Sequence, residues 1–325
     1  MTKITVVIPN YNGKKYLPGC LDALYHQIPE TPEYEVLIVD NASADGSIEA
    51  ARLAYPQTRI ICLQKNTGFC HAVNVGIQAS ASPYVILLNN DTKVKTGFIL
   101  ALYTAIEKDP SVFSVSAQML MWDRPELLDD AGDGLNVLGW AYARGKGRPA
   151  LEYHRPCRVF SACGGAAIYR RALFQKIGFF DEAHFAYLED LDIGYRANLF
   201  GYRNLYEPKA EVLHYGSASS GSRYNEFKTG LSSCNSIYVL YKNMPFLQLV
   251  WNLPFLIPGY LIKWLFFCKK HMGSTYLKGV EKGIRRCFSE DGRKNKVRCS
   301  EVKLRYYLWV QLQLYRNLAG FIRKN

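Results

Sequence analysis

The sequence predicts an α/β fold in which a mostly parallel sheet is wrapped by helices, and two observations support this prediction. Strand-like apolar segments alternate with helix-like segments in the first third of the chain, an order that is typical of parallel strands joined by right-handed crossovers. Residues 84–88 (Tyr-Val-Ile-Leu-Leu) then form an unbroken apolar run, which indicates a strand buried on both faces. Such a strand belongs in the middle of a sheet that helices cover.

The individual elements follow from local patterns along the chain. Short runs rich in apolar residues predict strands at 4–8, 35–39, 60–63 and 84–88, and a later one that ends at residue 214. Residues at helical spacing predict helices around Leu17, Leu21, Leu24 and Ile28, over 48–54, and around Ala72, Val75 and Ile77. A further apolar stripe, at Leu191, Tyr195 and Leu199, predicts a helix that starts near Glu189.

Composition narrows the class of protein. A chain of 325 residues with 49% hydrophobic content can bury a large core. Its N-terminus begins directly with a predicted strand and lacks the basic and apolar regions of a signal peptide. The nine cysteines contain no Cys-x-x-Cys pair, which argues against a disulfide framework and a zinc site. We therefore expect a reduced, cytoplasmic protein.

The net charge of +12 is concentrated in the last quarter of the chain. Residues 240–325 hold 17 basic and 4 acidic residues, whereas residues 1–239 hold 23 and 24. This difference predicts two parts: a main domain over 1–239 and a helical, basic and aromatic extension over 240–325 with its own partner or surface.

Polar residues stand where several of the predicted strands end. The central strand is followed by Asn90 and Asp91, and Asn10, Asp40 and Asn66 stand at the ends of the others. Each is also a typical turn residue, but ligands bind at the carboxyl edge of open α/β sheets, so several at one edge favour a ligand site. The chain has no G-x-G-x-x-G and no G-x-x-x-x-G-K-[ST] motif, which argues against a Rossmann dehydrogenase and a P-loop enzyme.

Three motifs resemble the family 2 glycosyltransferases: residues 7–12 (Val-Ile-Pro-Asn-Tyr-Asn), 39–47 and 66–74. The similarity covers about residues 1–240 and implies the GT-A fold, with a donor half at about 1–117 and an acceptor half at about 118–239. It also implies inverting sugar transfer from a nucleotide-diphosphate donor, assisted by Mg²⁺ or Mn²⁺. The implied nucleotide-sugar-binding residues are Pro9, Asn10, Tyr11, Asn12, Asp40, Asn66, Gly68, Asn74 and Asn90.

The resemblance also implies a metal site. Residues 89–91 (Asn-Asn-Asp) stand where the family has its D-x-D metal motif, and only the last carboxylate, Asp91, is present here. His214, at the end of an apolar strand, would be the second ligand, since a neutral imidazole suits Mn²⁺ or Mg²⁺. Without the resemblance, a lone histidine is more often a satisfied core or surface group.

The catalytic residues are expected at the start of the helix near Glu189. Carboxylates there can simply stabilise the free N–H groups of the helix, with Asp192 pairing with Arg196 one turn on. The resemblance instead implies that Asp190 is the general base and that Glu189 orients the acceptor. It also implies that Gly164 and Gly165 lie beside the donor sugar and the acceptor, where tight packing is the alternative explanation.

The section 118–160 shows few periodic signals, and we expect a surface loop over the active site. Asp129, Asp130 and Asp133 lie in this section but lack the spacing of a calcium-binding EF-hand. Its glycine and acidic signals resemble those of a rhamnosyltransferase-like subgroup, which favours dTDP-rhamnose as the donor.

Residues 246–268 are strongly apolar and aromatic, and basic residues follow them. A membrane-spanning helix needs roughly 20 predominantly apolar residues, but Pro254, Pro258 and Lys263 argue against a simple span. Interleaved aromatic and basic residues favour an anionic bilayer surface; packing against the catalytic domain and a true span are the alternatives. The basic residues form no nucleic-acid-binding motif.

The resemblance thus implies an inverting hexosyltransferase, peripheral on the inner face of the cell membrane. It would move rhamnose from dTDP-rhamnose to a glycan or lipid-linked glycan in cell-surface polysaccharide synthesis. A sugar-phosphate nucleotidyltransferase is one alternative, although it would need a glycine- and arginine-rich loop where residues 10–12 (Asn-Tyr-Asn) stand. A non-catalytic nucleotide-sugar-binding homologue is the other, suggested by the two amides at 89–90.

Overall fold

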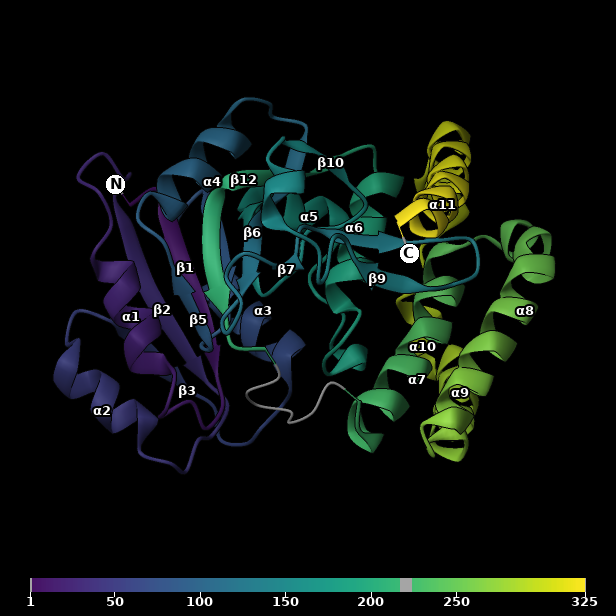
Figure 1. The fold of residues 1–325 in the computed structure, drawn as a ribbon, viewed down its shortest axis with the longest axis horizontal. Coiled ribbons are helices and arrows are strands. Elements are labelled where there is room, and N and C mark those ends of the chain that lie inside the picture. The colour runs from purple at the N-terminus through teal and green to yellow at the C-terminus, as the bar shows by residue number, and fades with distance from the viewer. Residues whose placement is uncertain (1, 217–223, 325) are drawn as a thin grey trace.

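The computed structural model describes residues 2–216 and 224–324 and confirms the predicted α/β fold (Figure 1). The large sheet is built from β1 (Ile4–Asn10), β2 (Tyr34–Asp40), β3 (Arg59–Cys62), β4 (Tyr84–Leu88), β5 (Thr92–Val94), β6 (Val112–Met121), β7 (Leu128–Asp130), β10 (Cys157–Val159), β11 (Ala166–Arg170) and β12 (Arg203–His214). Their order is β10-β12-β6-β11-β4-β1-β2-β3, with β5 added to β12 and β7 to β6. A separate hairpin joins β8 (Asp133–Leu135) to β9 (Ala141–Ala143).

The N-terminal half of the sheet has the predicted parallel arrangement. β1 lies between β2 and β4, and β3 continues beyond β2, all in parallel. β4 is buried along its whole length, with every residue at most 5% exposed, as its apolar run predicts. Antiparallel β11 follows β4, and β6 and β12 then pair in parallel with each other.

Helices cover both faces of the sheet. They are α1 (Leu17–Tyr25), α2 (Ser47–Ala54), α3 (Phe69–Ala79), α4 (Phe98–Glu107), α5 (Phe174–Ile177), α6 (Glu189–Leu199), α7 (Glu226–Asn243), α8 (Phe246–Lys269), α9 (Gly273–Cys287), α10 (Glu290–Lys294) and α11 (Leu304–Lys324). One core packs α1, α2 and α4 on one face, and a second packs α3, α5 and α6 on the other. A third core joins α6 to α7, α8 and α11.

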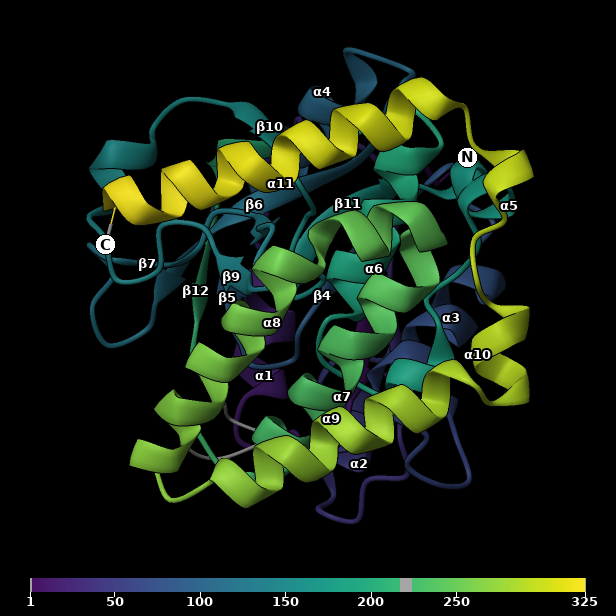
Figure 2. The ribbon, with the colours of Figure 1, turned by 90° about the vertical axis from the view of Figure 1, so that its right-hand side faces the viewer.

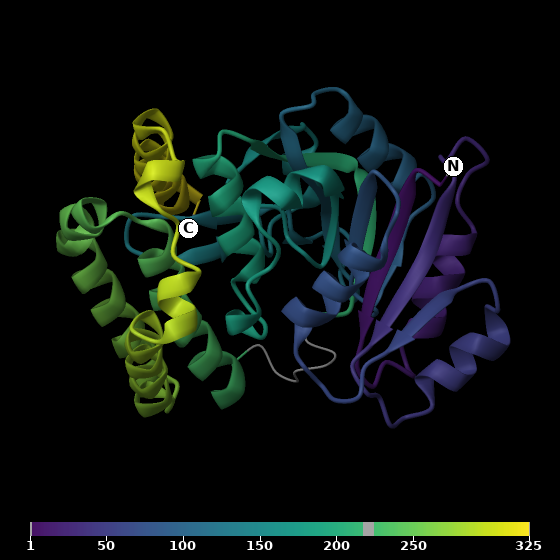
Figure 3. The same cartoon turned by 180° about the vertical axis from the view of Figure 1, so that it is seen from behind.

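The C-terminal helices lie together at the end of the molecule that is opposite α1 and α2 (Figures 1 and 3). Figure 2 shows this helical layer from its outer side. The expected division between residues 239 and 240 falls inside α7, which packs against α9. The third core therefore attaches α8 and α11 to α6 and the rest of the chain.

The apolar segment at 246–268 forms one continuous helix, α8, of 24 residues that contains both prolines. By length and composition α8 is able to cross a membrane, and 17% of its most apolar window is buried in the protein. Its exposed side chains include Phe246, Leu247, Trp251 and Ile257. Pro254 and Pro258 thus lie inside a continuous helix.

The prediction of a surface loop over residues 118–160 is wrong. β6 extends to Met121 and β7, β8, β9 and β10 follow, while Leu128, Ala131 and Leu135 are buried. Each of the four later strands has three residues; β7 pairs with β6, β8 with β9, and β10 with β12. Strands this short leave no readable period, because their pairing and not their local pattern defines them.

Candidate active site

A cavity of about 660 Å³ lies at the carboxyl edge of the parallel strands, beside the start of α6. Its lining residues come from the expected donor half and from the expected acceptor half, the last of them being Lys228. The two expected halves therefore meet at this cavity. The predicted site residues that line it are Pro9, Asn10, Tyr11, Asn66, Gly68, Asn90, Asp91, Gly165, Glu189, Asp190 and His214. The predicted residues outside the lining are Asn12, Asp40, Asn74 and Gly164.

The amides at the strand ends are held in a fixed chain of hydrogen bonds. Asn90 Nδ2 donates to Asn10 Oδ1 (2.7 Å), and Asn10 Nδ2 donates to Asp40 Oδ1 (2.9 Å). Asp40 also accepts from the backbone N–H and the hydroxyl of Ser43. Because buried polar groups are costly unless they are bonded, Asp40 orients Asn10 from behind the cavity wall.

Asn12 and Asn74 hold neighbouring loops. The Asn12 side-chain oxygen accepts from the Ala44 N–H (3.0 Å). Asn74 donates to the Phe180 carbonyl (2.8 Å) and accepts from the Phe180 N–H (3.0 Å). Asn74 thereby fixes the segment that leads toward α6.

Gly68 permits a close contact between two loops of the cavity. Its φ is +86°, and a Cβ there would lie 2.6 Å from the Phe185 carbonyl oxygen, so a side chain would force the loops apart. Asn41, which the sequence analysis did not assign to the site, donates to the Gly68 carbonyl and accepts from Thr67. The 66–69 loop is thus fixed against the segment before α6.

Asp91 and His214 meet at one end of the cavity. His214 Nε2 lies 3.3 Å from Asp91 Oδ1, and its Nδ1 lies 2.7 Å from Asp129 Oδ2. Burial opposes protonation of His214, but hydrogen bonds to Asp129 and Asp91 outweigh it and raise its pKa to about 9. A divalent cation would have to displace the proton on Nε2, and Asp91 Oδ1 and His214 Nε2 are then close enough to share it, with Asp129 orienting the ring from behind.

Glu189 and Asp190 stand in the first turn of α6, which starts where the sequence predicted. Asp190 accepts from the Leu191 N–H (2.7 Å) and from the Gly164 N–H (3.3 Å). Burial nevertheless raises the pKa of Asp190, and burial and the neighbouring Asp190 raise that of Glu189 well above its usual range. A carboxylate with a raised pKa in a cavity is suited to accept a proton near neutral pH.

Asp130 and Asp133 complete an acidic group that the sequence analysis did not place in the site. Burial raises the pKa of Asp130 to about 7, and burial and the carboxylates of Asp130 and Asp190 raise that of Asp133 well above its ordinary value. A hydrogen bond between the Asp133 and Asp190 carboxyl groups lowers the pKa of Asp190 and raises that of Asp133, so Asp133 is the favoured proton donor of the pair. These residues were missed because the pairing of the Asp133 N–H with the Ser161 carbonyl brings them in from a segment without periodicity.

We expect the acid limb of the activity–pH profile to depend on the Asp133 proton donor. Asp133→Ala removes the bond that favours ionised Asp190, so the pKa of Asp190 rises and the acid limb moves to higher pH. Asp133→Asn keeps an N–H donor and leaves the limb near that of the wild type. The measurement is kcat/KM against pH for the three proteins, and coincident acid limbs would contradict this role.

The segment before α6 has an unusual backbone. Phe185, Tyr187 and Leu188 all have φ between 63° and 67°, a region that side chains disfavour and that is often found at functional sites. Asn235 of α7 donates to the carbonyls of residues 184, 186 and 187 at 2.8–3.0 Å. The C-terminal helices therefore hold the segment that positions Glu189 and Asp190.

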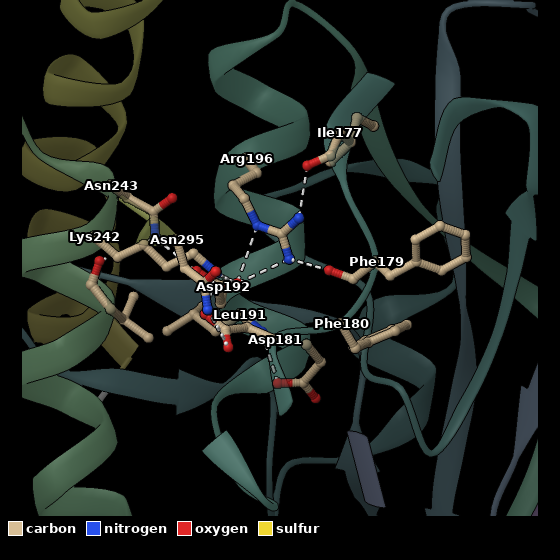
Figure 4. Close-up of polar contacts among 12 residues, drawn as sticks. Ile177, Phe179, Phe180, Asp181, Leu191, Asp192, Arg196, Lys242, Asn243 and Asn295 are labelled. Carbon is tan, nitrogen blue, oxygen red and sulfur yellow. Dashed lines mark hydrogen bonds and ion pairs between the residues drawn. The ribbon is translucent and has the colours of Figure 1, made fainter. Parts of the chain in front are cut away.

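A buried charged network connects α6 to α7 (Figure 4). Asp192 Oδ2 pairs with Arg196 Nη2 (2.9 Å), as predicted, and with Lys242 Nζ (2.8 Å). Lys242 also pairs with Asp181 Oδ2 (2.7 Å), and Asn243 donates to Asp192 Oδ1 (2.8 Å). Burial opposes ionisation of Asp192, but the two cations outweigh it and lower its pKa. These buried ion pairs give Asp192 a structural role, so it is not available as a base.

Lys242→Met is expected to lower the free energy of unfolding by about 3–5 kcal/mol, because it leaves two buried carboxylates without a shared cation. Lys242 is 3% exposed. Lys278→Met, on the exposed side of α9, is the matched control and should change stability little. Urea unfolding of the full-length proteins measures both; equal stability of the two variants would show that the network contributes nothing.

Comparisons with known proteins agree with this architecture. The model of "Glycosyl transferase family 2" matches residues 5–178. The N-acetylglucosaminyl-diphospho-decaprenol L-rhamnosyltransferase of Mycobacterium tuberculosis is 32% identical over 247 residues, which cover 67% of this chain and 78% of the relative. Among solved structures, Staphylococcus aureus TarS 1–349 with UDP-GlcNAc has a TM-score of 0.60 at 16% identity, covering 99% of this chain and 92% of TarS. The mannosyltransferase PcManGT from Pyrobaculum calidifontis with GDP-Man and Mn²⁺ has a TM-score of 0.54 at 16% identity, covering 95% and 87%.

The fold and the cavity at its strand ends are those of a nucleotide-sugar-dependent transferase. The chain belongs to glycosyltransferase family 2. This membership sets aside the sugar-phosphate nucleotidyltransferase alternative.

Proposed function

We propose that the chain transfers rhamnose from dTDP-rhamnose, with inversion, to a hydroxyl of a sugar carried on a lipid diphosphate. The observation that carries this proposal is the single cavity that holds Asp91 and His214 beside the strand-end amides and Asp190 at the start of α6. The name of the mycobacterial relative supports rhamnose and a lipid-linked acceptor in cell-surface polysaccharide synthesis.

The donor occupies the end of the cavity formed by β1, β4 and the 66–69 loop. Tyr11 and Asn66 offer an exposed ring and an amide to a base and ribose. Asn10 is 1% exposed and bonded to Asp40 and Asn90, so it shapes the wall behind them. Asp91 and His214 would hold Mg²⁺ or Mn²⁺, which supplies positive charge to stabilise the leaving nucleotide diphosphate. Asp129 keeps the ring of His214 turned toward Asp91.

The acceptor occupies the other end of the cavity. Asp190 takes the proton of the attacking hydroxyl as its oxygen bonds to the anomeric carbon and the bond to the diphosphate breaks. Glu189 Oε2 is buried without a hydrogen-bond partner in the described part of the chain, so it is free to orient an acceptor hydroxyl. Gly165 lets the backbone approach the sugar closely.

A screen of nucleotide sugars by thermal shift, with and without Mn²⁺, tests the donor assignment. A ligand that binds the native state raises its stability, so dTDP-rhamnose should give the largest rise. A larger rise with a uridine or guanosine donor would replace dTDP-rhamnose. Release of nucleotide from the donor by the protein, with and without acceptor, separates an active enzyme from the non-catalytic alternative.

We also propose that the chain is peripheral on the inner face of the cell membrane through its C-terminal helices. The exposed apolar side chains of α8 supply area for insertion into the interface. Lys269 and Lys270 follow them at the end of α8, and Lys278, Lys282 and Arg285 stand exposed on α9. Anionic lipids attract such groups by about 1 kcal/mol each.

The full-length protein is therefore expected to sediment with anionic vesicles, and high salt should weaken this only in part, because salt does not screen apolar insertion. Leu247→Ser with Trp251→Ser should lower vesicle partitioning by at least about tenfold, given the area that these side chains bury. Leu53→Ser on α2 removes an equally exposed leucine at the opposite end of the molecule and is the control. If the double variant and the control partition equally to vesicles, α8 does not bind the membrane through these side chains.

A further inference from the structure

A second cavity, of about 850 Å³, lies between the β8–β9 hairpin and α11. Figure 2 shows α11 passing along this side of the molecule. Hydrogen bonds fix the two walls of this cavity to each other. Asn317 Nδ2 donates to the Leu135 carbonyl (2.8 Å), and the Val137 N–H donates to the Leu314 carbonyl (3.2 Å). This second cavity is thus part of the folded structure.

The second cavity adjoins the active site. Asp133, Ala143 and Lys146 line both cavities. Asp133 is bonded to Asp190, so the wall that the cavities share stands directly beside the expected base. A molecule whose hydroxyl reaches Asp190 can therefore extend its next group into the second cavity.

The lining of the second cavity is strongly basic. Its basic side chains are Arg144, Lys146, Arg148, Arg158 and Arg316. Among the described residues that line it, Asp133 is the one carboxyl group, and burial raises its pKa well above the ordinary value, which disfavours its charged form. Lys146 pairs with Asp129, whereas Arg148 and Arg316 have no ion-pair partner in the described part of the chain. Unpaired guanidinium groups in a cavity favour a phosphate, whose oxygens accept their N–H groups in pairs.

Aromatic groups provide the remaining contacts. The Arg158 guanidinium lies 3.8 Å from the centre of the Trp309 ring, which fixes its position. Tyr315, next to Arg316 on α11, contacts Phe255 of α8 with ring centres 5.6 Å apart. One side of α11 therefore faces the basic cavity, and the helix also contacts the proposed membrane-binding helix.

We propose that the second cavity binds the diphosphate group of a lipid-linked acceptor sugar. This inference rests on the proposed function. The donor diphosphate lies at Asp91 and His214, neither of which lines the second cavity, so the anion bound here is a separate one. The acceptor sugar lies at the wall formed by Asp133, its diphosphate contacts Arg148 and Arg316, and its lipid leaves toward α8.

Calorimetric titration of the full-length protein with decyl diphosphate, a probe without a sugar, tests this inference. Arg316→Gln and Arg148→Gln should each weaken binding by about tenfold or more, since each removes a charge-assisted pair of hydrogen bonds. Arg305→Gln, on the same helix but outside the cavity, is the matched control and should bind as the wild type does. Circular dichroism and the thermal shift with dTDP establish that each variant is folded. Unchanged affinity in both cavity variants overturns the inference.

Two further measurements distinguish the diphosphate of an acceptor from a membrane lipid headgroup as the bound anion. With a lipid-diphosphate sugar as acceptor, Arg316→Gln should raise the acceptor KM and leave kcat and the donor KM unchanged. If the cavity variants lose binding to phosphatidylglycerol vesicles but still bind decyl diphosphate, the cavity binds a lipid headgroup and the inference is overturned. A wild-type protein that binds nucleotide sugars but not decyl diphosphate overturns this inference alone, whereas failure to bind any nucleotide sugar contradicts the proposed function.

Discussion

Asp190→Asn is expected to lower kcat by about 10²–10⁴-fold, the usual contribution of a positioned general base. Asparagine has nearly the same shape, and its one oxygen can still accept from the Leu191 N–H, the shorter of the two bonds, so the start of α6 should stay in place although the bond from the Gly164 N–H is lost. The amide cannot take the proton of the acceptor hydroxyl. The measurement is kcat at saturating donor and acceptor, together with the dissociation constant of the donor, which should barely change.

Glu189→Gln is the matched control for this experiment. It changes the neighbouring carboxylate in the same turn of α6 and should affect the acceptor KM more than kcat, because Glu189 is assigned to orientation. Near-normal turnover of Asp190→Asn would remove Asp190 from the role of base and point to Glu189. Asp192 is no alternative, since Arg196 and Lys242 hold it in a buried network.

Asp91→Ala should abolish the gain in donor affinity that Mn²⁺ or Mg²⁺ gives, because it removes the one carboxylate in residues 89–91. His214→Ala should weaken that gain less. Asp129→Asn, which changes only the residue behind His214, should lower metal affinity by about 10–100-fold. Donor affinity is measured by calorimetry with and without the metal.

The wild-type protein in excess EDTA provides the control for the metal site. Chelation should lower its donor affinity to that of Asp91→Ala. Full activity in EDTA would contradict the metal site and leave Lys146 and Lys228, which line the same cavity, as basic side chains for the diphosphate.

Much of the donor side of the cavity could be predicted from the sequence because it depends on local patterns. An apolar run that stops at polar residues identifies both β4 and its carboxyl end, and Asn90 and Asp91 lie at the cavity where that pattern placed them. On the acceptor side, the start of α6 at Glu189 also followed from the spacing of its apolar stripe. In each case the signal lies within one element.

The rest of the acceptor side could not be predicted in the same way because it is assembled from distant segments. Asp130 and Asp133 reach Asp190 only through the pairing of three-residue strands with β6 and with the segment near Ser161. Lys242 and Asn235 act from α7, far along the chain from α6. From the local sequence, polar and charged side chains of this kind are expected at the solvated surface, and only tertiary packing shows that they are buried.

The anomeric configuration of the product is the most direct test of the central claim, that Asp190 promotes a single displacement at the anomeric carbon. Nuclear magnetic resonance of the product formed by the wild-type enzyme from a nucleotide sugar and a lipid-diphosphate acceptor measures it. The expected product has the configuration opposite to that of the donor. A product with the configuration of the donor would contradict the single displacement and the role given to Asp190.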